Sequence, residues 1–306
     1  MQQVKTPLKK IKLVEVGPRD GLQNISPILP VEARARLIDN LAHAGLKHIE
    51  AGSFVSPVKV PAMADSANVF QLINRKPDIV YSALTPNLRG FEQAMEAHAS
   101  EVAVFISASE GFSQHNINCS IADSLTRIKP VIEAANQYNC KVRGYISCVM
   151  GCPYDGKVRH EEVAQFCHEL IQMGCYEVSL GDTIGVGTPL QAKALFHAVA
   201  KLVPIEAIAA HFHNTYGQAL ANLYALIEEG LLTIDSAIAG LGGCPYAPGA
   251  SGNVATEDVV YMLNGMGIIS GVDLQGLVTA AEDICQCLGV KSAANAGIAL
   301  SYLRSI

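Results

Sequence analysis

Charged residues are scarce in this sequence of 306 residues. Asp, Glu, Lys and Arg make up only 16% of it, whereas half of the residues are hydrophobic. Such a composition can bury a sizeable core, so it excludes a disordered chain. The formal net charge of -6 also excludes a broadly basic surface for nucleic acid or an anionic membrane. An anionic substrate would therefore need local positive groups, such as an arginine or a metal ion.

The sequence also lacks long apolar runs and a regular cysteine pattern. No apolar stretch is long enough to cross a bilayer, and residues 1–10 hold no apolar run typical of a secretion signal. The nine cysteines are odd in number and scattered, which argues against a disulfide framework. Because such thiols fit a reducing compartment, we expect a cytoplasmic protein without a membrane or nucleic-acid partner.

Eight short apolar runs, often rich in β-branched residues, alternate with helix-like segments. Strands that are buried on both faces have this pattern, and we predict them at residues 11–17, 48–52, 79–84, 101–107, 142–148, 176–180, 207–212 and 234–239. Helical patterns cover residues 31–44, 161–173, 191–202 and 218–229. Pro30 precedes the first helix, and Gly45, Gly174 and Gly230 end three of them.

Eight alternations of strand and helix are typical of an α/β fold of the (β/α)8 or TIM-barrel type. A doubly wound open sheet is the structural alternative. A Gly/Pro/Ala-rich loop, residues 241–253, and further helical segments follow the eighth strand. Because no linker or low-complexity tract interrupts the chain, we predict one catalytic domain over residues 1–306 with additional C-terminal helices.

Polar residues gather at the carboxyl ends of the predicted strands, where barrels carry their active sites. His211 and His213 are two residues apart in the seventh strand, so both imidazoles point to the same face. They are either metal ligands or hydrogen-bonded barrel histidines. Asp20 follows the first strand and is either a third ligand or the cap of a turn. Such a nitrogen and oxygen set suits Mg²⁺ or Mn²⁺.

Three further residues are candidates for the chemistry. Arg19 offers a fixed charge for an enolate or carbonyl oxygen, or forms a salt bridge at the barrel mouth. Glu50 ends a mostly apolar strand and needs a partner there; we favour an ion pair with Arg19 over proton transfer. Cys244 lies between glycines and a proline and is either a proton donor on a mobile loop or an ordinary thiol.

Together these residues resemble the 3-hydroxy-3-methylglutaryl-CoA lyase family of metal-dependent barrel enzymes, over about residues 11–288. The matching motifs are 15–24 (EVGPRDGLQN), 53–57 (SFVSP), 84–87 (LTPN), 116–120 (NINCS) and 179–185 (SLGDTIG). The stretch 242–258 (GGCPYAPGASGNVATED) resembles the loop that marks the lyase branch. The opening Arg-Asp and the His-x-His are shared more widely, including by condensing synthases.

The resemblance implies a role for each matching position. The metal ligands would be Asp20, His211, His213 and Asn253, and the catalytic residues would be Arg19, Cys244, Asp182 and Glu50. Arg19 would stabilise an enolate, Cys244 would supply a proton, and Asp182 would act as a base. One departure is Asn214, where the family usually has aspartate; the change removes a charge near His213.

The implied reaction splits 3-hydroxy-3-methylglutaryl-CoA into acetyl-CoA and acetoacetate, the chemistry of leucine degradation and ketone-body formation. Its implied partners are an acyl-CoA thioester substrate, a divalent metal (Mg²⁺ or Mn²⁺) and a second copy of the chain in a homodimer. Three alternatives remain: a lyase for a longer-branched 3-hydroxyglutaryl-CoA, a Claisen-condensing acyltransferase on the same barrel, and a non-catalytic barrel that only binds CoA or a protein.

Overall fold

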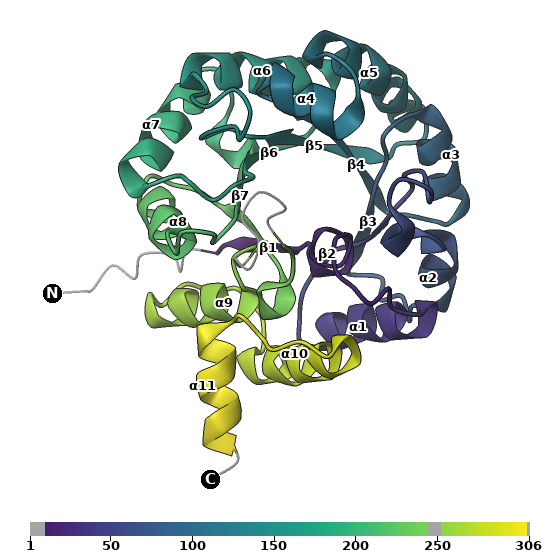
Figure 1. Cartoon of the computed structure of the whole chain (residues 1–306), viewed down its shortest axis with the longest axis vertical. Helices are drawn as coiled ribbons and strands as arrows, with labels where there is room; N and C mark the ends of the chain where they lie inside the picture. The colour runs from purple at the N-terminus through teal and green to yellow at the C-terminus, as the bar shows by residue number, and fades with distance from the viewer. Residues whose placement is uncertain (1–9, 244–251, 305–306) are drawn as a thin grey trace, which may run out of the picture.

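The chain folds into a closed barrel of eight parallel strands surrounded by helices (Figure 1). The computed structural model describes residues 10–243 and 252–304. The strands are β1 (Lys12–Glu15), β2 (His48–Ser53), β3 (Val80–Leu84), β4 (Glu101–Ser107), β5 (Lys141–Ser147), β6 (Glu177–Asp182), β7 (Ile208–Phe212) and β8 (Thr233–Ser236). The main helices are α1 (Val31–His43), α2 (Ser66–Leu72), α3 (Leu88–Glu96), α4 (Glu110–Ile117), α5 (Ile121–Gln137), α6 (His160–Met173), α7 (Pro189–Ala200), α8 (Ala219–Glu228), α9 (Thr256–Gly265), α10 (Leu274–Leu288) and α11 (Asn295–Arg304).

Each strand pairs in parallel with the next in sequence, and β8 returns to pair with β1 through the register Leu13 to Ile234. This closure confirms the predicted TIM barrel and rules out the open sheet, which would leave two unpaired edge strands. All carboxyl ends of the strands therefore open on the same face. That common face brings residues that are far apart in the sequence to one mouth.

Two predicted strands end earlier than expected. The first stops at Glu15, and Gly17–Gly21 form a π-helical turn, η1, in which the amides of Arg19, Asp20 and Gly21 all donate to the carbonyl of Val16. Gly17 is required there, because a Cβ at this position would lie 2.5 Å from a Glu15 carboxylate oxygen. The eighth strand stops at Ser236, since the chain turns through a 3-10 helix, η4 (Ile238–Gly240).

The helical extension predicted after β8 is present as α9, α10 and α11. Helix α10 lies beside α1 and buries Leu277, Ile284 and Leu288 in the same core as the barrel strands. Helix α11 projects away from the barrel (Figure 1). Across residues 10–243 and 252–304, none of the helices combines the length and apolarity that a membrane crossing requires.

Candidate active site

A cavity of about 500 Å³ opens at the carboxyl end of the barrel. Four of the predicted site residues line it: Arg19, Asp20, His211 and His213. Much of the remaining wall is apolar. Its apolar residues come from the loop after β2 (Val55 and Val60), from the end of β3 and the loop after it (Leu84 and Pro86), from β4 (Phe105) and from α4 (Phe112 and Ile117). The cavity therefore offers both charged and apolar surface to one bound molecule.

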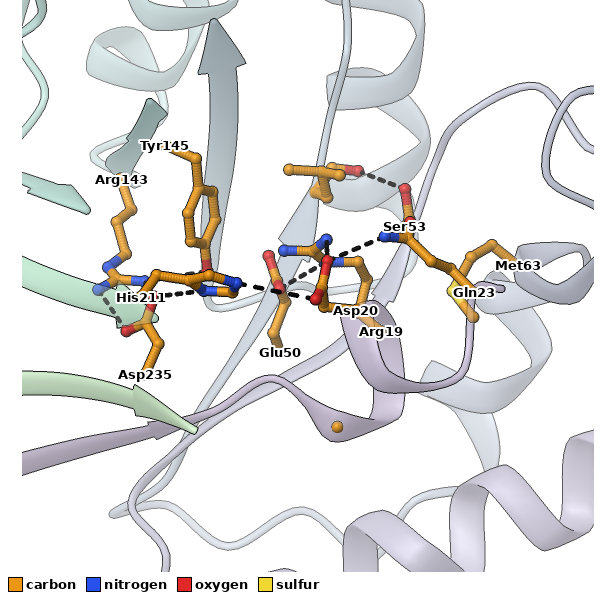
Figure 2. Close-up of polar contacts among 12 residues, drawn as sticks. Arg19, Asp20, Gln23, Glu50, Ser53, Met63, Arg143, Tyr145, His211 and Asp235 are labelled. Atoms are coloured by element: carbon orange, nitrogen blue, oxygen red, sulfur yellow. Dashed lines mark hydrogen bonds and ion pairs between the residues drawn. The ribbon is translucent and has the colours of Figure 1, made fainter. Parts of the chain in front are cut away.

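Asp20, His211 and His213 form a compact cluster whose ligand atoms all lie within 4.8 Å of one another. An Asp20 carboxylate oxygen, Oδ2, lies 3.7 Å from His211 Nε2 and 3.8 Å from His213 Nε2. Figure 2 shows His211 reaching across toward Asp20. These separations exceed a hydrogen bond and suit donors that share a cation, so the donor set fits a divalent metal.

Asn253 reaches this cluster because its backbone is fixed to the end of β7. It forms an isolated antiparallel bridge with His213, and the neighbouring Asn214 amide donates to the Gly252 carbonyl at 2.7 Å. The Asn253 side-chain amide donates to Asp20 Oδ2 at 2.8 Å and to the Leu241 carbonyl at 3.1 Å. The four predicted metal ligands therefore converge from η1, from the end of β7 and from the residues before α9.

The charges around Asp20 favour its ionised form. Burial alone would raise the pKa of Asp20, but the Arg19 guanidinium and the imidazoles of His213 and His211 hold it well below its usual range. Asp20 is therefore a carboxylate at neutral pH. An ionised oxygen and two imidazole nitrogens are the donors that a hard or borderline divalent cation takes.

Arg19 links the cluster to Glu50. Its guanidinium donates to a Glu50 oxygen at 2.6 Å and to Asp20 Oδ1 at 2.5 Å, and it lies 5.3 Å from the ring centroid of Tyr145 (Figure 2). Burial raises the pKa of Glu50, and Arg19 only partly offsets this. The ion pair that we favoured for Glu50 is present, and Glu50 itself is fully buried beneath Arg19.

Asp182 ends β6 beside this cavity. Its neighbours Gly181 and Thr183 line the cavity and Asp182 does not. Both of its oxygens accept backbone N–H groups of the following loop, from Val186 at 3.2 Å and Gly187 at 2.9 Å. The role of Asp182 as a proton-abstracting base stays a prediction. Its side chain alternates away from the barrel interior and anchors the loop after β6.

Two remaining predictions concern Cys244 and Asn214. Cys244 lies outside the described residues; Gly243, which precedes it, lines the cavity. The side-chain oxygen of Asn214 accepts the backbone N–H of Ala219 at 3.1 Å. Asn214 thus caps the start of α8, a task for which an uncharged amide suffices.

Sequence reasoning missed Asp235 and Arg143, which lie directly behind His211 inside the barrel. Asp235 accepts a hydrogen bond from His211 Nδ1 at 3.1 Å, and Arg143 pairs with both Asp235 oxygens (Figure 2). The available signal was a charged residue within an otherwise apolar buried strand, which needs a partner. Both residues lie before the carboxyl ends of their strands, whereas barrel active sites are expected at those ends.

Comparisons with known proteins agree with this geometry. A family model described as HMGL-like matches residues 10–284. The 3-hydroxy-3-isohexenylglutaryl-CoA/hydroxy-methylglutaryl-CoA lyase of Pseudomonas aeruginosa is 60% identical over 292 residues, or 95% of this chain and 97% of that protein. A crystal structure of hydroxymethylglutaryl-CoA lyase from Pseudomonas aeruginosa matches with a TM-score of 0.95 and 59% identity, over 97% of this chain and 99% of that one.

A further solved structure carries ligands. It is an HMG-CoA lyase from Acinetobacter baumannii in complex with coenzyme A and 3-methylmalate, and it is similar with a TM-score of 0.89 and 37% identity, over 94% of this chain and 93% of that one. Because the family model spans most of the sequence and the relatives match along nearly their whole length, the chain belongs to the HMGL-like family.

Proposed function

We propose that this protein is a metal-dependent carbon–carbon lyase that cleaves 3-hydroxy-3-methylglutaryl-CoA to acetyl-CoA and acetoacetate. The observation that carries the proposal is the cluster of Asp20, His211 and His213 beside the buried Arg19 in one cavity. The names of the related lyases give the substrate class. A barrel that only binds CoA would have no need of this arrangement.

Asp20, His211, His213 and the side-chain oxygen of Asn253 would hold the divalent metal, Mg²⁺ or Mn²⁺. When bound, the metal acts as a Lewis acid that lowers the pKa of a coordinated hydroxyl group. The fixed positions of the ligands orient the tertiary hydroxyl and the far carboxylate of the substrate.

The bond between C2 and C3 breaks heterolytically, and its electrons pass to the thioester carbonyl as an enolate. The C3 hydroxyl gives its proton to a carboxylate base, for which Asp182 is our candidate, as C3 becomes the ketone of acetoacetate. Arg19 is the buried cation of the cavity and balances the charge that develops on the enolate oxygen. Cys244 then delivers a proton to C2, which yields acetyl-CoA.

A second candidate substrate is a longer-branched 3-hydroxyglutaryl-CoA. The cavity has an apolar wall, with Leu84, Phe105 and Phe112 among its members, that a longer branch could contact. The relative at 60% identity carries a name that includes the isohexenyl compound. A Claisen-condensing activity is less well supported, because the related proteins described above are named as lyases.

The test is an assay of purified protein with 3-hydroxy-3-methylglutaryl-CoA and Mg²⁺ or Mn²⁺, in which acetoacetate is followed over time. We expect metal-dependent acetoacetate, no product with EDTA, and loss of product in Cys244→Ala. A longer-branched substrate measured in parallel ranks the two candidates by kcat/KM. If neither substrate is cleaved by metal-loaded protein, acetyl-CoA with a 2-keto acid tests condensation.

Sedimentation velocity tests the homodimer that we expect, and cell fractionation tests the cytoplasmic location.

A further inference from the structure

A row of buried polar side chains runs through the barrel centre behind His211. It contains Asp235, Arg143 and Glu177, each no more than 2% exposed, and it comes from β8, β5 and β6. The proposed chemistry uses none of these three residues, and none of them lines the substrate cavity. Charges this deep in a barrel are costly to bury, so their contacts show what they support.

Asp235 is the centre of this row. Its Oδ2 accepts three donors: Ser179 Oγ at 2.7 Å, Arg143 Nη1 at 2.9 Å and His211 Nδ1 at 3.1 Å. Its Oδ1 accepts Arg143 Nη2 at 2.7 Å. Arg143 in turn donates through Nε to Glu177 at 2.7 Å. The Asp235 carboxylate therefore cannot rotate away from His211 without breaking a bidentate ion pair.

This contact dictates which His211 nitrogen carries the proton. A carboxylate accepts and does not donate, so Nδ1 of His211 must be the N–H nitrogen. Nε2 then presents its lone pair toward Asp20, 3.7 Å away. His213 differs, because its buried Nδ1 has no hydrogen-bond partner among the described residues. Of the two imidazoles, only that of His211 has its orientation set by a neighbouring carboxylate.

We propose that Asp235, clamped by Arg143, is a positioning residue that fixes the Nδ1–H tautomer of His211 and thereby sets the affinity of the cluster for a divalent cation. Asp235 touches neither the substrate cavity nor the proposed metal. The inference rests on the proposed metal site for its affinity part. The tautomer part concerns the protein alone. Carboxylate partners of metal-binding histidines typically change metal affinity by about 10- to 100-fold.

Mn²⁺ binding, measured by calorimetry, tests the affinity part. Asp235→Ala removes the acceptor, and we expect the Kd for Mn²⁺ to rise by about 10- to 100-fold. The double variant Arg143→Met with Asp235→Val removes the anion and its cation together, which buried ion pairs often tolerate; it should show the same loss. Glu101→Gln is the matched control, because it neutralises a buried carboxyl of β4 that bonds Tyr176 rather than His211; its Kd should equal that of wild type.

Nitrogen NMR of metal-free wild-type protein at mildly alkaline pH tests the tautomer directly, with His211→Gln assigning the resonance. We expect the Nδ1–H form for His211, and its loss in Asp235→Ala. An Nε2–H form in the wild type, or an unchanged Kd in a folded Asp235 variant, overturns the proposal. If both variants fail to fold, the wild-type spectrum alone decides. Wild-type protein that binds no Mn²⁺ but shows the Nδ1–H form would refute the proposed function and leave the tautomer assignment standing.

Discussion

Arg19 is the residue whose role in the proposed reaction is most specific. Because its charge balances an enolate that exists only after bond cleavage begins, Arg19→Met should lower kcat by about 100- to 1000-fold and change KM little. The measurement is steady-state acetoacetate formation in both proteins. Its ion pair with Glu50 is buried, so a melting curve must accompany the kinetics. A rise in KM of similar size with an unchanged kcat would assign Arg19 to substrate binding rather than to the enolate.

His213 provides a second prediction at this scale. His213→Ala removes one of three converging donors, so the bound divalent metal should fall below one equivalent under conditions that saturate the wild type. Metal content after gel filtration measures this, and His168→Ala is the control, since His168 lies on α6 and bonds the Leu202 carbonyl. Unchanged metal content in His213→Ala would remove it from the ligand set.

Most of the residue-scale site followed from strand geometry. His211 and His213 could be predicted to share a face because alternate residues in a strand do so. The same rule turns the side chain of Asp182, one position after the cavity-lining Gly181, away from the barrel interior. Asp235 and Arg143 could not be paired from the sequence, because 92 positions separate them and only the closed barrel brings them together.

At the scale of elements, the residues before α9 decide whether the metal cluster is complete. Gly252 packs tightly against Gly242, where an added Cβ would lie 2.3 Å from the carbonyl oxygen. Gly252→Ala should therefore displace Asn253 from Asp20, weaken Mn²⁺ binding about 10-fold and destabilise the fold by about 1–3 kcal/mol. Gly265→Ala, at the end of α9 with open space around it, is the control and should bind Mn²⁺ normally. Normal Mn²⁺ binding in both variants would show that this segment does not contribute to the metal site.

The positions of the elements were largely predictable, and their ends were not. The glycines that end α1 and α6 have positive φ angles, 99° at Gly45 and 117° at Gly174, as helix stop signals require. Helices α2, α3, α4 and α5 were not assigned from the sequence. The early ends of β1 and β8 depend on η1 and η4, whose turns are set by tertiary contacts such as the Glu15 carboxylate with the Ile238 amide at 2.9 Å.

At the scale of the whole molecule, buried glutamates make stability depend on pH. Burial raises the pKa of Glu257 from 4.5 to about 8, and that of Glu15 and of Glu101 to about 7. The folded protein thus holds these protons more tightly than the unfolded chain does. Their contribution to stability is complete below about pH 4.5 and is lost as the pH rises through about 7 to 8.

We therefore expect the melting temperature to fall between about pH 5 and pH 8, with a smaller fall in Glu257→Gln. Asp20 acts in the opposite sense, because its pKa is lowered; its contribution is lost only on acidification below its unfolded value of 3.8. Calorimetry of both proteins across this range measures the effect. A wild-type melting temperature that rises steadily toward pH 8 would show that these carboxyls are ionised in the folded state.

The barrel as a whole was predictable, because eight apolar runs of strand length separated by helix-length segments fit few other folds. Because the strands follow one another around the barrel in chain order, neighbouring strand ends could also be predicted. What the sequence alone could not supply was the depth of each polar residue: Asp20 follows β1 and lines the cavity, whereas Asp182 ends β6 and does not line it. That difference arises from η1, which turns Asp20 inward.

The most direct test titrates Mn²⁺ into EDTA-stripped protein and follows bound metal and acetoacetate release from 3-hydroxy-3-methylglutaryl-CoA in the same samples. We predict that acetoacetate release rises in proportion to the occupancy of one site per chain, and that Asp20→Asn loses both together. Acetoacetate release from protein that holds no metal, or full metal occupancy without any cleavage, would contradict a metal-dependent lyase at this cluster.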